Sequence, residues 1–446
     1  MSQAKRQMNL GAFLYNFGHH FAAWRYSGTK TDGVIDMEFY KRLGATAERG
    51  KLDMLFLADT VSIPHLKDAE TNVSFVYPEA TSVLAALSAV TEYVGLAATV
   101  STTFNEPYNV ARRFSTIDHL SGGRAAWNVV TSTKQAEALN FGKEILLEHS
   151  LRYERAKEFL DVVTALWDSW EDEALLFNKD TGIFADTERI HAISHRGAAF
   201  SVEGPLNIPR SPQGRPVIIE AGTSPSGQRL AAQTAEVVFT ACEDKEEGKA
   251  FYSKLKALLP EYGRSEDDLK VMPGVLTFIG ETEEEAKEKE AAFNDLVLPK
   301  AGVVHLSRLL NFDLSGYPLD GPLPDISEQG NTSRALMIID MARKQGLTVR
   351  ELSLHFAIAR GHLVIRGTAE QIADQLEDWF VSRACDGFNV MPPYLPRGLD
   401  EFVDQVVPLL QQRGIFRTEY SGRTLRDHLG LKRPANRFSG TNAAQR

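Results

Sequence analysis

The segment His119–Ser132, which reads HLSGGRAAWNVVTS, is the stretch that indicates the fold class. A Gly-Gly turn leads into the short apolar run Ala125–Val130, which has β-branched residues near its end and predicts a buried strand. Asn128 lies inside this run, and Thr131 and Ser132 follow it. Because α/β barrels bind ligands at the carboxyl ends of their strands, the segment is a candidate floor of a binding site. A plain core strand followed by a polar turn is the alternative interpretation.

Seven further strand patterns alternate with helical patterns along the chain, which predicts a parallel sheet closed into a TIM (β/α)8 barrel, an α/β fold. The expected strands are Asn9–Tyr15, Asp53–Ala58, Val94–Val100, Ala125–Val130, Pro216–Ala221, Glu236–Ala241, Lys270–Ile279 and Asp386–Met391. The expected helices include Met37–Arg49, Pro78–Val90, Glu246–Tyr262 and Thr368–Phe380, the last with a capping box formed by Thr368 and Gln371.

Two connections are much longer than ordinary barrel loops. They cover about 150–215 and about 298–365, and we interpret both as insertions in barrel loops, where lids and substrate walls are found. The chain 1–446 is therefore expected to be a single TIM-barrel domain with two insertions. Its polar C-terminal tail, about 434–446, is expected to be mobile.

Composition excludes several classes of protein. The chain has 446 residues, 43% hydrophobic and 24% charged, which is typical of a globular protein with a large core. No apolar stretch approaches 20 residues, and the N-terminus has no signal-peptide pattern, so we expect neither a membrane protein nor an exported one. Two distant cysteines fit a reducing cytoplasm. A net charge of -10 argues against nucleic-acid binding but permits an anionic ligand at a local basic cluster.

Polar residues follow several of the expected strands. Asp59 comes directly after one strand, and Thr99 stands near the end of the next. His149 and Tyr153 are four residues apart, which on a helix places them on one face. Ser224 lies in a Gly/Ser/Pro loop before a helix, an arrangement suited to binding phosphate through backbone N–H groups. Each feature alone is weak, but together they fall on one end of the predicted barrel.

Other kinds of site find little support. The 11 histidines include no HExxH motif and no close Cys/His set, so we expect no metal. The chain has no GxSxG element of a serine hydrolase and no GxGxxG dinucleotide fingerprint.

Several motifs occur together in a known order. They are LADT (57–60), STTFNEPYNVARRFSTIDHLSGGRAAWNVVTS (101–132), EHSLRYERAKEFLDVVTALWDSW (148–170), GPLNIPRSPQGRPVIIEAG (204–222) and DGFNVMPPYLP (386–396). In these motifs the chain resembles the bacterial luciferase-like flavin monooxygenases, in the subgroup of the nitrilotriacetate and dibenzothiophene-sulfone monooxygenases. The resemblance runs from about Met8 to Pro434.

This resemblance implies a two-component enzyme of the cytoplasm. Reduced FMN would be a diffusible cosubstrate, supplied by a separate NAD(P)H:flavin reductase and used with O₂ on a small-molecule substrate. The chain would form a homodimer or homotetramer. The implied FMN contacts are Asp59, Thr99, His149, Tyr153 and Ser224, with Asn128 and Thr131 as additions near the flavin ring and with Tyr153 and Ser224 at the phosphate.

The motif HHFAAWRY (19–26) supplies the implied reaction residues. His20 matches a family histidine that would hydrogen-bond the activated oxygen or move a proton, and a satisfied buried histidine is the alternative. Arg25 is a candidate to bind a substrate carboxylate in a bidentate manner, and a structural ion pair is its alternative.

One departure from the family narrows the expected substrate. Sulfone and alkane enzymes carry a second active-site histidine, but alignment on NFDLSGYPLD (311–320) puts Leu309 there, with His305 out of register. The resemblance therefore favours a small carboxylated amine or thioether, cleaved at a C–N or C–S bond. The alternatives are a sulfone or organosulfur monooxygenase, or a barrel oxidoreductase using flavin or F420 without oxygenation.

Overall fold

The computed structural model describes residues 6–63, 70, 76–145, 147–326 and 333–439. Eight parallel strands close into a barrel, in the order β1-β2-β3-β4-β9-β10-β11-β13, with β13 pairing back to β1. This arrangement confirms the predicted TIM-barrel fold and each of the eight predicted strands. The strands are β1 (Asn9–Leu14), β2 (Met54–Leu57), β3 (Gly95–Ser101), β4 (Ala125–Val130), β9 (Val217–Glu220), β10 (Val237–Thr240), β11 (Lys270–Ile279) and β13 (Gly387–Val390).

The opening segment folds as its residues dictate. Gly122 and Gly123 adopt φ values of 70° and 94°, a left-handed conformation that favours glycine and turns the chain into β4. Along β4, Ala126 belongs to the core inside the barrel. Trp127 faces outward, contacts the rings of Phe114 and Phe159, and donates its indole N–H to the Val100 carbonyl. This alternation places Asn128 inside the barrel.

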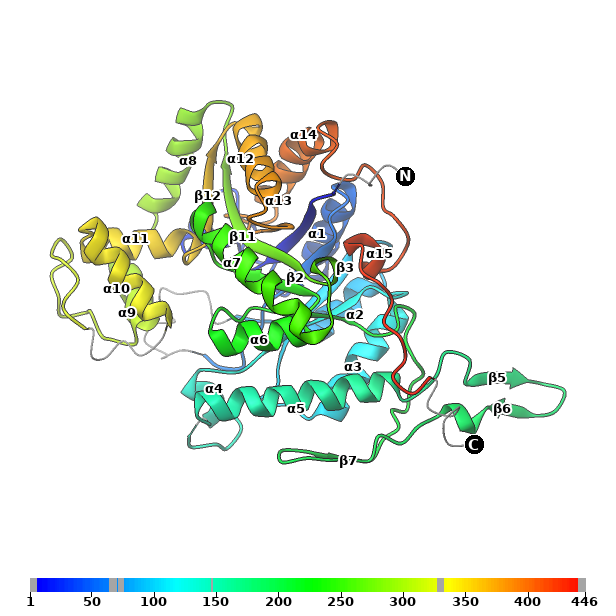
Figure 1. Ribbon diagram of the computed structural model, residues 1–446. Coiled ribbons are helices and arrows are strands. Elements are labelled where there is room, and N and C mark those ends of the chain that lie inside the picture. The colour runs from blue at the N-terminus through cyan, green and yellow to red at the C-terminus, as the bar shows by residue number, and fades with distance from the viewer. Residues whose placement is uncertain (1–5, 64–69, 71–75, 146, 327–332, 440–446) are drawn as a thin grey trace.

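Helices surround the barrel and bury their apolar faces against it (Figure 1). Thr368 caps α12 in the predicted capping box with Gln371. The surrounding helices are α1 (Met37–Arg49), α2 (Ala80–Ser88), α3 (Pro107–Leu120), α5 (His149–Asp168), α6 (Pro225–Thr234), α7 (Lys245–Leu258), α8 (Glu283–Asp295), α12 (Ala369–Val381) and α14 (Val407–Gln412). Shorter helices are α4 (Gln135–Leu139), α13 (Arg397–Glu401), the π-helix η6 (Phe402–Val406) and α15 (Leu425–Leu429), with 3-10 turns at Ala23–Arg25, Thr187–Arg189, Leu259–Tyr262 and Glu266–Asp268.

The first long connection, about residues 150–215, consists of a barrel helix followed by two hairpins. Its opening part is the barrel helix α5, which packs against α3, so the excursion begins only after Asp168. Two hairpins then project from the body, β5 (Leu175–Asn178) with β6 (Ile183–Ala185) and β7 (His195–Arg196) with β8 (Ser201–Val202) (Figure 1). Because α5 leads back to the amino ends of the strands, these hairpins lie away from the carboxyl ends where the cavities open.

The second long connection forms a helical unit with its own core. It contains α9 (Pro299–Leu310), α10 (Ser333–Gln345) and α11 (Val349–Ala359), whose apolar side chains pack on one another (Figure 1). Its end was not predicted to be a strand, but β12 (Leu363–Gly367) pairs in parallel with the second half of β11.

The described part of the C-terminal tail is anchored. Asn436 is buried and donates to the carbonyls of Asp168 and Trp170, and Phe438 stacks on His191. These contacts hold residues 436 and 438 against the body, and residues 440–446 lie outside the described part of the chain. No described helix is long and apolar enough to cross a membrane.

Candidate functional site

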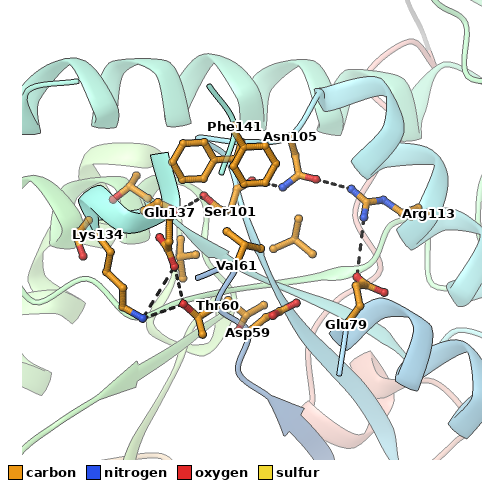
Figure 2. Close-up of a pocket in the computed structure, with 17 residues that line it drawn as sticks. Asp59, Thr60, Val61, Glu79, Ser101, Asn105, Arg113, Lys134, Glu137 and Phe141 are labelled. Atoms are coloured by element: carbon orange, nitrogen blue, oxygen red, sulfur yellow. Dashed lines mark hydrogen bonds and ion pairs between the residues drawn. The ribbon is translucent and has the colours of Figure 1, made fainter. Parts of the chain in front are cut away.

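A cavity of about 310 Å³ opens at the carboxyl ends of β2, β3 and β4 (Figure 2). This is the end of the barrel where the sequence places the site. Three of the predicted residues, Asp59, Thr99 and Thr131, line it. The other lining residues are Thr60, Val61, Glu79, Val100, Ser101, Phe104, Asn105, Arg113, Val130, Ser132, Thr133, Lys134, Glu137 and Phe141.

Asp59 follows β2 and faces both the cavity and the start of α2. One of its carboxylate oxygens accepts from the Ala80 backbone N–H at 3.3 Å, so it also helps to cap that helix. Burial raises the pKa of Asp59 to about 6, and the nearby carboxylates of Glu79 and Glu137 act in the same direction. The cavity therefore contains a carboxyl group that titrates close to neutral pH.

Thr99 and Asn128 are direct neighbours on β3 and β4. The Asn128 amide donates to Thr99 Oγ1 at 2.8 Å, and both side chains are buried. The amide oxygen of Asn128 has no hydrogen-bond partner among the described residues. Buried acceptors normally have a hydrogen-bond partner. The Asn128 amide oxygen is therefore suited to accept a hydrogen bond from an N–H group of a ligand bound near the end of β4.

Charged residues missed by the sequence analysis border the cavity. Lys134 donates to Thr60 Oγ1 at 2.8 Å, and Thr60 donates to Glu137 at 2.6 Å (Figure 2). On the opposite wall, Arg113 donates to Asn105 at 2.7 Å and lies 4.0 Å from Glu79. Thr60, Asn105 and Arg113 lie within the quoted motifs but were not singled out there, and Lys134 and Glu137 lie in none of them. Their nearness to the ends of β2, β3 and β4 could have indicated them.

A second cavity of about 220 Å³ adjoins the first around the end of β4. The two share Val130, Thr131 and Thr133, and the remaining lining residues are Val129, Tyr153, Ala156, Glu220, Ala221, Gly222 and Leu230. Tyr153 is half-buried and reaches this cavity from α5. The side chain of His149 lies outside the described part of the structure.

Glu220 is a buried acid that the sequence analysis missed. It ends β9, and its carboxyl accepts from Thr234 Oγ1 on α6. Burial raises the pKa of Glu220 to about 8, so this side chain is mostly uncharged at neutral pH.

Ser224 begins the helix next to the second cavity. Its Oγ accepts from the Gly227 N–H at 3.2 Å and caps α6. A Cβ atom on Gly222 would lie only 2.9 Å from Gly227 Cα. Because neither residue has a side chain, the loop after β9 can pack closely against the first turn of α6. At the amino end of α6, Pro225 has no N–H and the Gly227 N–H is capped by Ser224, so the Ser226 N–H and the positive end of the helix dipole are what suit this end to phosphate.

His20 and Arg25 lie apart from both cavities. His20 is buried against Phe293, and its Nε2 is 3.2 Å from Asn294 Oδ1. Burial lowers the pKa of His20 to about 4, so the ring is neutral at pH 7. Arg25 is exposed and donates to the Leu296 carbonyl. The structure does not bring Arg25 to the described cavities.

The two residues compared in the second insertion both lie on α9. Leu309 is half-buried within the helical unit, whereas the ring of His305 contacts that of Phe21 near the barrel. The described residues contain no group of three potential metal ligands.

Comparison with known proteins gives consistent matches. The profile of the family described as luciferase-like monooxygenase matches residues 14–386. Nitrilotriacetate monooxygenase component A of Aminobacter aminovorans is 50% identical over 445 residues, covering 97% of this chain and 98% of that protein. N-acetyl-S-(2-succino)cysteine monooxygenase of Bacillus subtilis (strain 168) is 48% identical over 443 residues, covering 98% of this chain and all of that protein. The structure of riboflavin lyase (RcaE) with modified FMN and riboflavin is similar with a TM-score of 0.86, at 30% identity, covering 96% and 97% of the two chains.

Proposed function

Because this chain belongs to the luciferase-like monooxygenase family, we propose that it is the oxygenase of a two-component system acting on a small carboxylated amine or thioether. The protein is a flavin-dependent monooxygenase of that family. Its relatives at about half identity are named for nitrilotriacetate and for N-acetyl-S-(2-succino)cysteine, a polycarboxylated amine and a carboxylated thioether. These names support the substrate class.

The observation that carries the proposal is the pair of adjoining cavities around the end of β4. Asp59, Thr99, Thr131 and Tyr153 line them, and Ser224 begins the helix beside them. The unpartnered amide oxygen of Asn128 fits a flavin ring N–H, and the amino end of α6 fits the FMN phosphate. FMN held in this way would supply, in its reduced form, the two electrons that activate O₂.

The chain's own residues bind the flavin, orient it and keep water away. His20 and His149 remain proposed as site residues. Both ring nitrogens of His20 have protein partners, the Asn294 amide oxygen and the Ala22 N–H, so His20 would exchange one of them to meet a ligand. His149 begins α5, and its side chain lies outside the described part of the structure. Arg25 is less suited to bind substrate, because it is exposed and bonded to the Leu296 carbonyl.

The overall reaction balances as an oxygenation. A group N–CH₂–COO⁻, with O₂ and FMNH₂, gives N–CH(OH)–COO⁻, FMN and water. The hydroxylated carbon then releases the amine and an α-oxo acid, and a thioether would release a thiol in the same way. The product is thus an aldehyde or ketone acid that can be measured directly.

We further propose that a separate NAD(P)H:flavin reductase supplies the reduced FMN. The relative named component A indicates a system with a second component. A supply of NAD(P)H fits the expected cytoplasmic location, and a dimer or tetramer remains the expected assembly.

The test is oxygen uptake by the purified protein with NADH, FMN and a flavin reductase. Nitrilotriacetate and N-acetyl-S-(2-succino)cysteine should give oxo acid in proportion to oxygen consumed, with catalase added to return oxygen from uncoupled peroxide. Dibenzothiophene sulfone and a long-chain alkane should give no product. Product from the sulfone alone would contradict the substrate class, and a yellow protein that retains FMN and oxidises NADH without reductase would contradict the two-component proposal.

A further inference from the structure

A cluster of aromatic and basic side chains lies at the mouth of the barrel, after the carboxyl end of β1. We call Tyr15, His19, Tyr77, Arg360 and His362 the mouth cluster. Tyr15 follows β1, and β1 pairs with β2, which leads directly to Asp59. The mouth cluster therefore neighbours the proposed flavin site along the carboxyl edge of the barrel.

Arg360 is held in a fixed position within this cluster. It ends α11 in a left-handed conformation with φ of 54°, where the second insertion returns to the barrel. Its guanidinium lies 4.0 Å from the centre of the Tyr15 ring and donates to His19 Nδ1. A cation over an aromatic face is attracted by the ring, so the stack and the hydrogen bond together orient the guanidinium.

His19 is uncharged in this arrangement. It is buried, and its Nε2 lies 2.8 Å from the Phe13 carbonyl, which can only accept a hydrogen bond. Nε2 therefore carries the proton, and Nδ1 is free to accept from Arg360. Burial lowers the pKa of His19 well below its usual value, and the charges of Arg360 and His362 act in the same direction.

The surroundings of Arg360 favour an anion. The cluster stands next to aromatic rings inside the barrel, Phe13, Phe56 and Phe239, whose centroids lie 4.9 to 5.6 Å apart. His362 stacks on Phe239. Glu243, which lies near Gly361, is hydrogen-bonded to His355. A carboxylate brought beside these rings loses water and gains most from a preoriented, planar cation.

We propose that Arg360 binds a carboxylate of the substrate and thereby selects anionic amines or thioethers over neutral ones. This inference rests on the proposed function and assigns to Arg360 the role first expected of Arg25. Arg360 is half-buried at the mouth, whereas Arg25 is exposed and bonded to the Leu296 carbonyl. The guanidinium can donate to both carboxylate oxygens in one plane, which a lysine ammonium cannot do.

The experiment compares an acid with its uncharged ester. Oxygen uptake and titration calorimetry are measured with nitrilotriacetate and with its trimethyl ester, for the wild type, Arg360→Gln, Arg360→Lys and the control Arg25→Gln. We expect Arg360→Gln to raise KM and Kd for the acid about 10- to 100-fold and to leave the ester nearly unchanged. Arg360→Lys should recover part of the affinity for the acid, and Arg25→Gln should behave as the wild type.

Other outcomes overturn the inference in distinguishable ways. If Arg360→Gln weakens acid and ester equally, Arg360 only positions the insertion and does not bind substrate. If the wild type oxidises the acid and Arg360→Gln does so with unchanged KM, the inference fails while the proposed function stands. If the wild type oxidises no carboxylated compound, the proposed function fails and the assignment of Arg360 fails with it.

Discussion

Burial acts on Asp59 and His20 in opposite directions. Removing a charged group from water favours its neutral form, so the pKa of Asp59 rises to about 6 and that of His20 falls to about 4. At neutral pH the histidine is uncharged, and the aspartate is mostly ionised but readily protonated. His20 therefore cannot act as a cation in the resting protein, which limits it to neutral hydrogen bonding or to accepting a proton.

We predict that His20→Gln reduces the sensitivity of the fold to acid. Between pH 4 and 6.5 the unfolded chain binds a proton at this position and the folded chain does not, so stability rises with pH across that window. At pH 5 the cost to the wild type is about 2 kcal/mol, which the variant would avoid. Urea unfolding at pH 5 and pH 8 measures the difference, and an equal loss of stability in both proteins would contradict the assigned neutral state.

We predict that Asp59→Asn stabilises the protein only at higher pH. The folded chain holds a proton more tightly here than the unfolded chain, so the wild type loses stability as pH rises from about 4 to about 6. With solvent screening of this half-buried group taken into account, the gain at pH 8 should be about 1–2 kcal/mol, and at pH 4 it should vanish. Unfolding curves at both pH values test this prediction, and a gain of the same size at both would point to a cause other than charge.

The secondary-structure elements that could be predicted are those that a local sequence pattern specifies. The eight barrel strands are short apolar runs bounded by turn residues, and the α12 capping box is visible as Thr368 and Gln371. The strand β12 was missed because it pairs with the second half of an unusually long β11, a non-local feature. The direction of the first insertion was not predicted, although the buried residues Ala156, Phe159, Leu160, Val163 and Leu166 recur at the spacing of a helix.

The same difference between local and tertiary features explains which residues of the candidate site could be predicted. That Asp59, Thr99 and Thr131 line this cavity follows from their positions at strand ends, which a sequence pattern reveals. Arg113 reaches the barrel mouth from α3 and Arg360 from the end of α11, and tertiary packing brings both there. Lys134 lies in the loop just after β4, but no sequence pattern distinguishes it. Arg25 was expected in the site because it is close in sequence to His20, yet the chain carries it outward.

Helix α6 permits a test that separates capping from ligand binding. Ser224 caps this helix, so Ser224→Ala should cost about 1 kcal/mol of stability, whereas Ser224→Gly should cost only a few tenths. If the hydroxyl also contacts the FMN phosphate, both variants should lose about 10- to 100-fold in flavin affinity, the worth of one hydrogen bond to a charged group. Fluorescence titration with FMN measures this loss, and unchanged affinity in both variants would remove Ser224 from the cofactor site.

At the scale of the whole molecule, the two ends of the barrel have different tasks. The carboxyl end carries both cavities and the mouth cluster. The amino end is closed by the C-terminal segment, whose Leu425, Leu429 and Leu431 join the core inside the barrel. Buried ion pairs fix this segment: Arg417 contacts Asp53 just before β2, and Arg426 contacts Glu236 just before β10.

The last prediction follows from this separation of the two ends. Burial would raise the pKa of Glu236, but the charge and hydrogen bonds of Arg426 outweigh it and keep the carboxylate ionised. Arg426→Ala would leave that charge buried without its partner and should lower the free energy of unfolding by about 3–5 kcal/mol. The exposed Arg423 on the same segment provides the control, since Arg423→Ala should change stability by less than about 0.5 kcal/mol.

At a temperature where both variants remain folded, their FMN affinity should equal that of the wild type, because the amino end of a barrel supports stability and the carboxyl end binds ligands. A loss of FMN affinity in folded Arg426→Ala would show instead that the two ends are coupled.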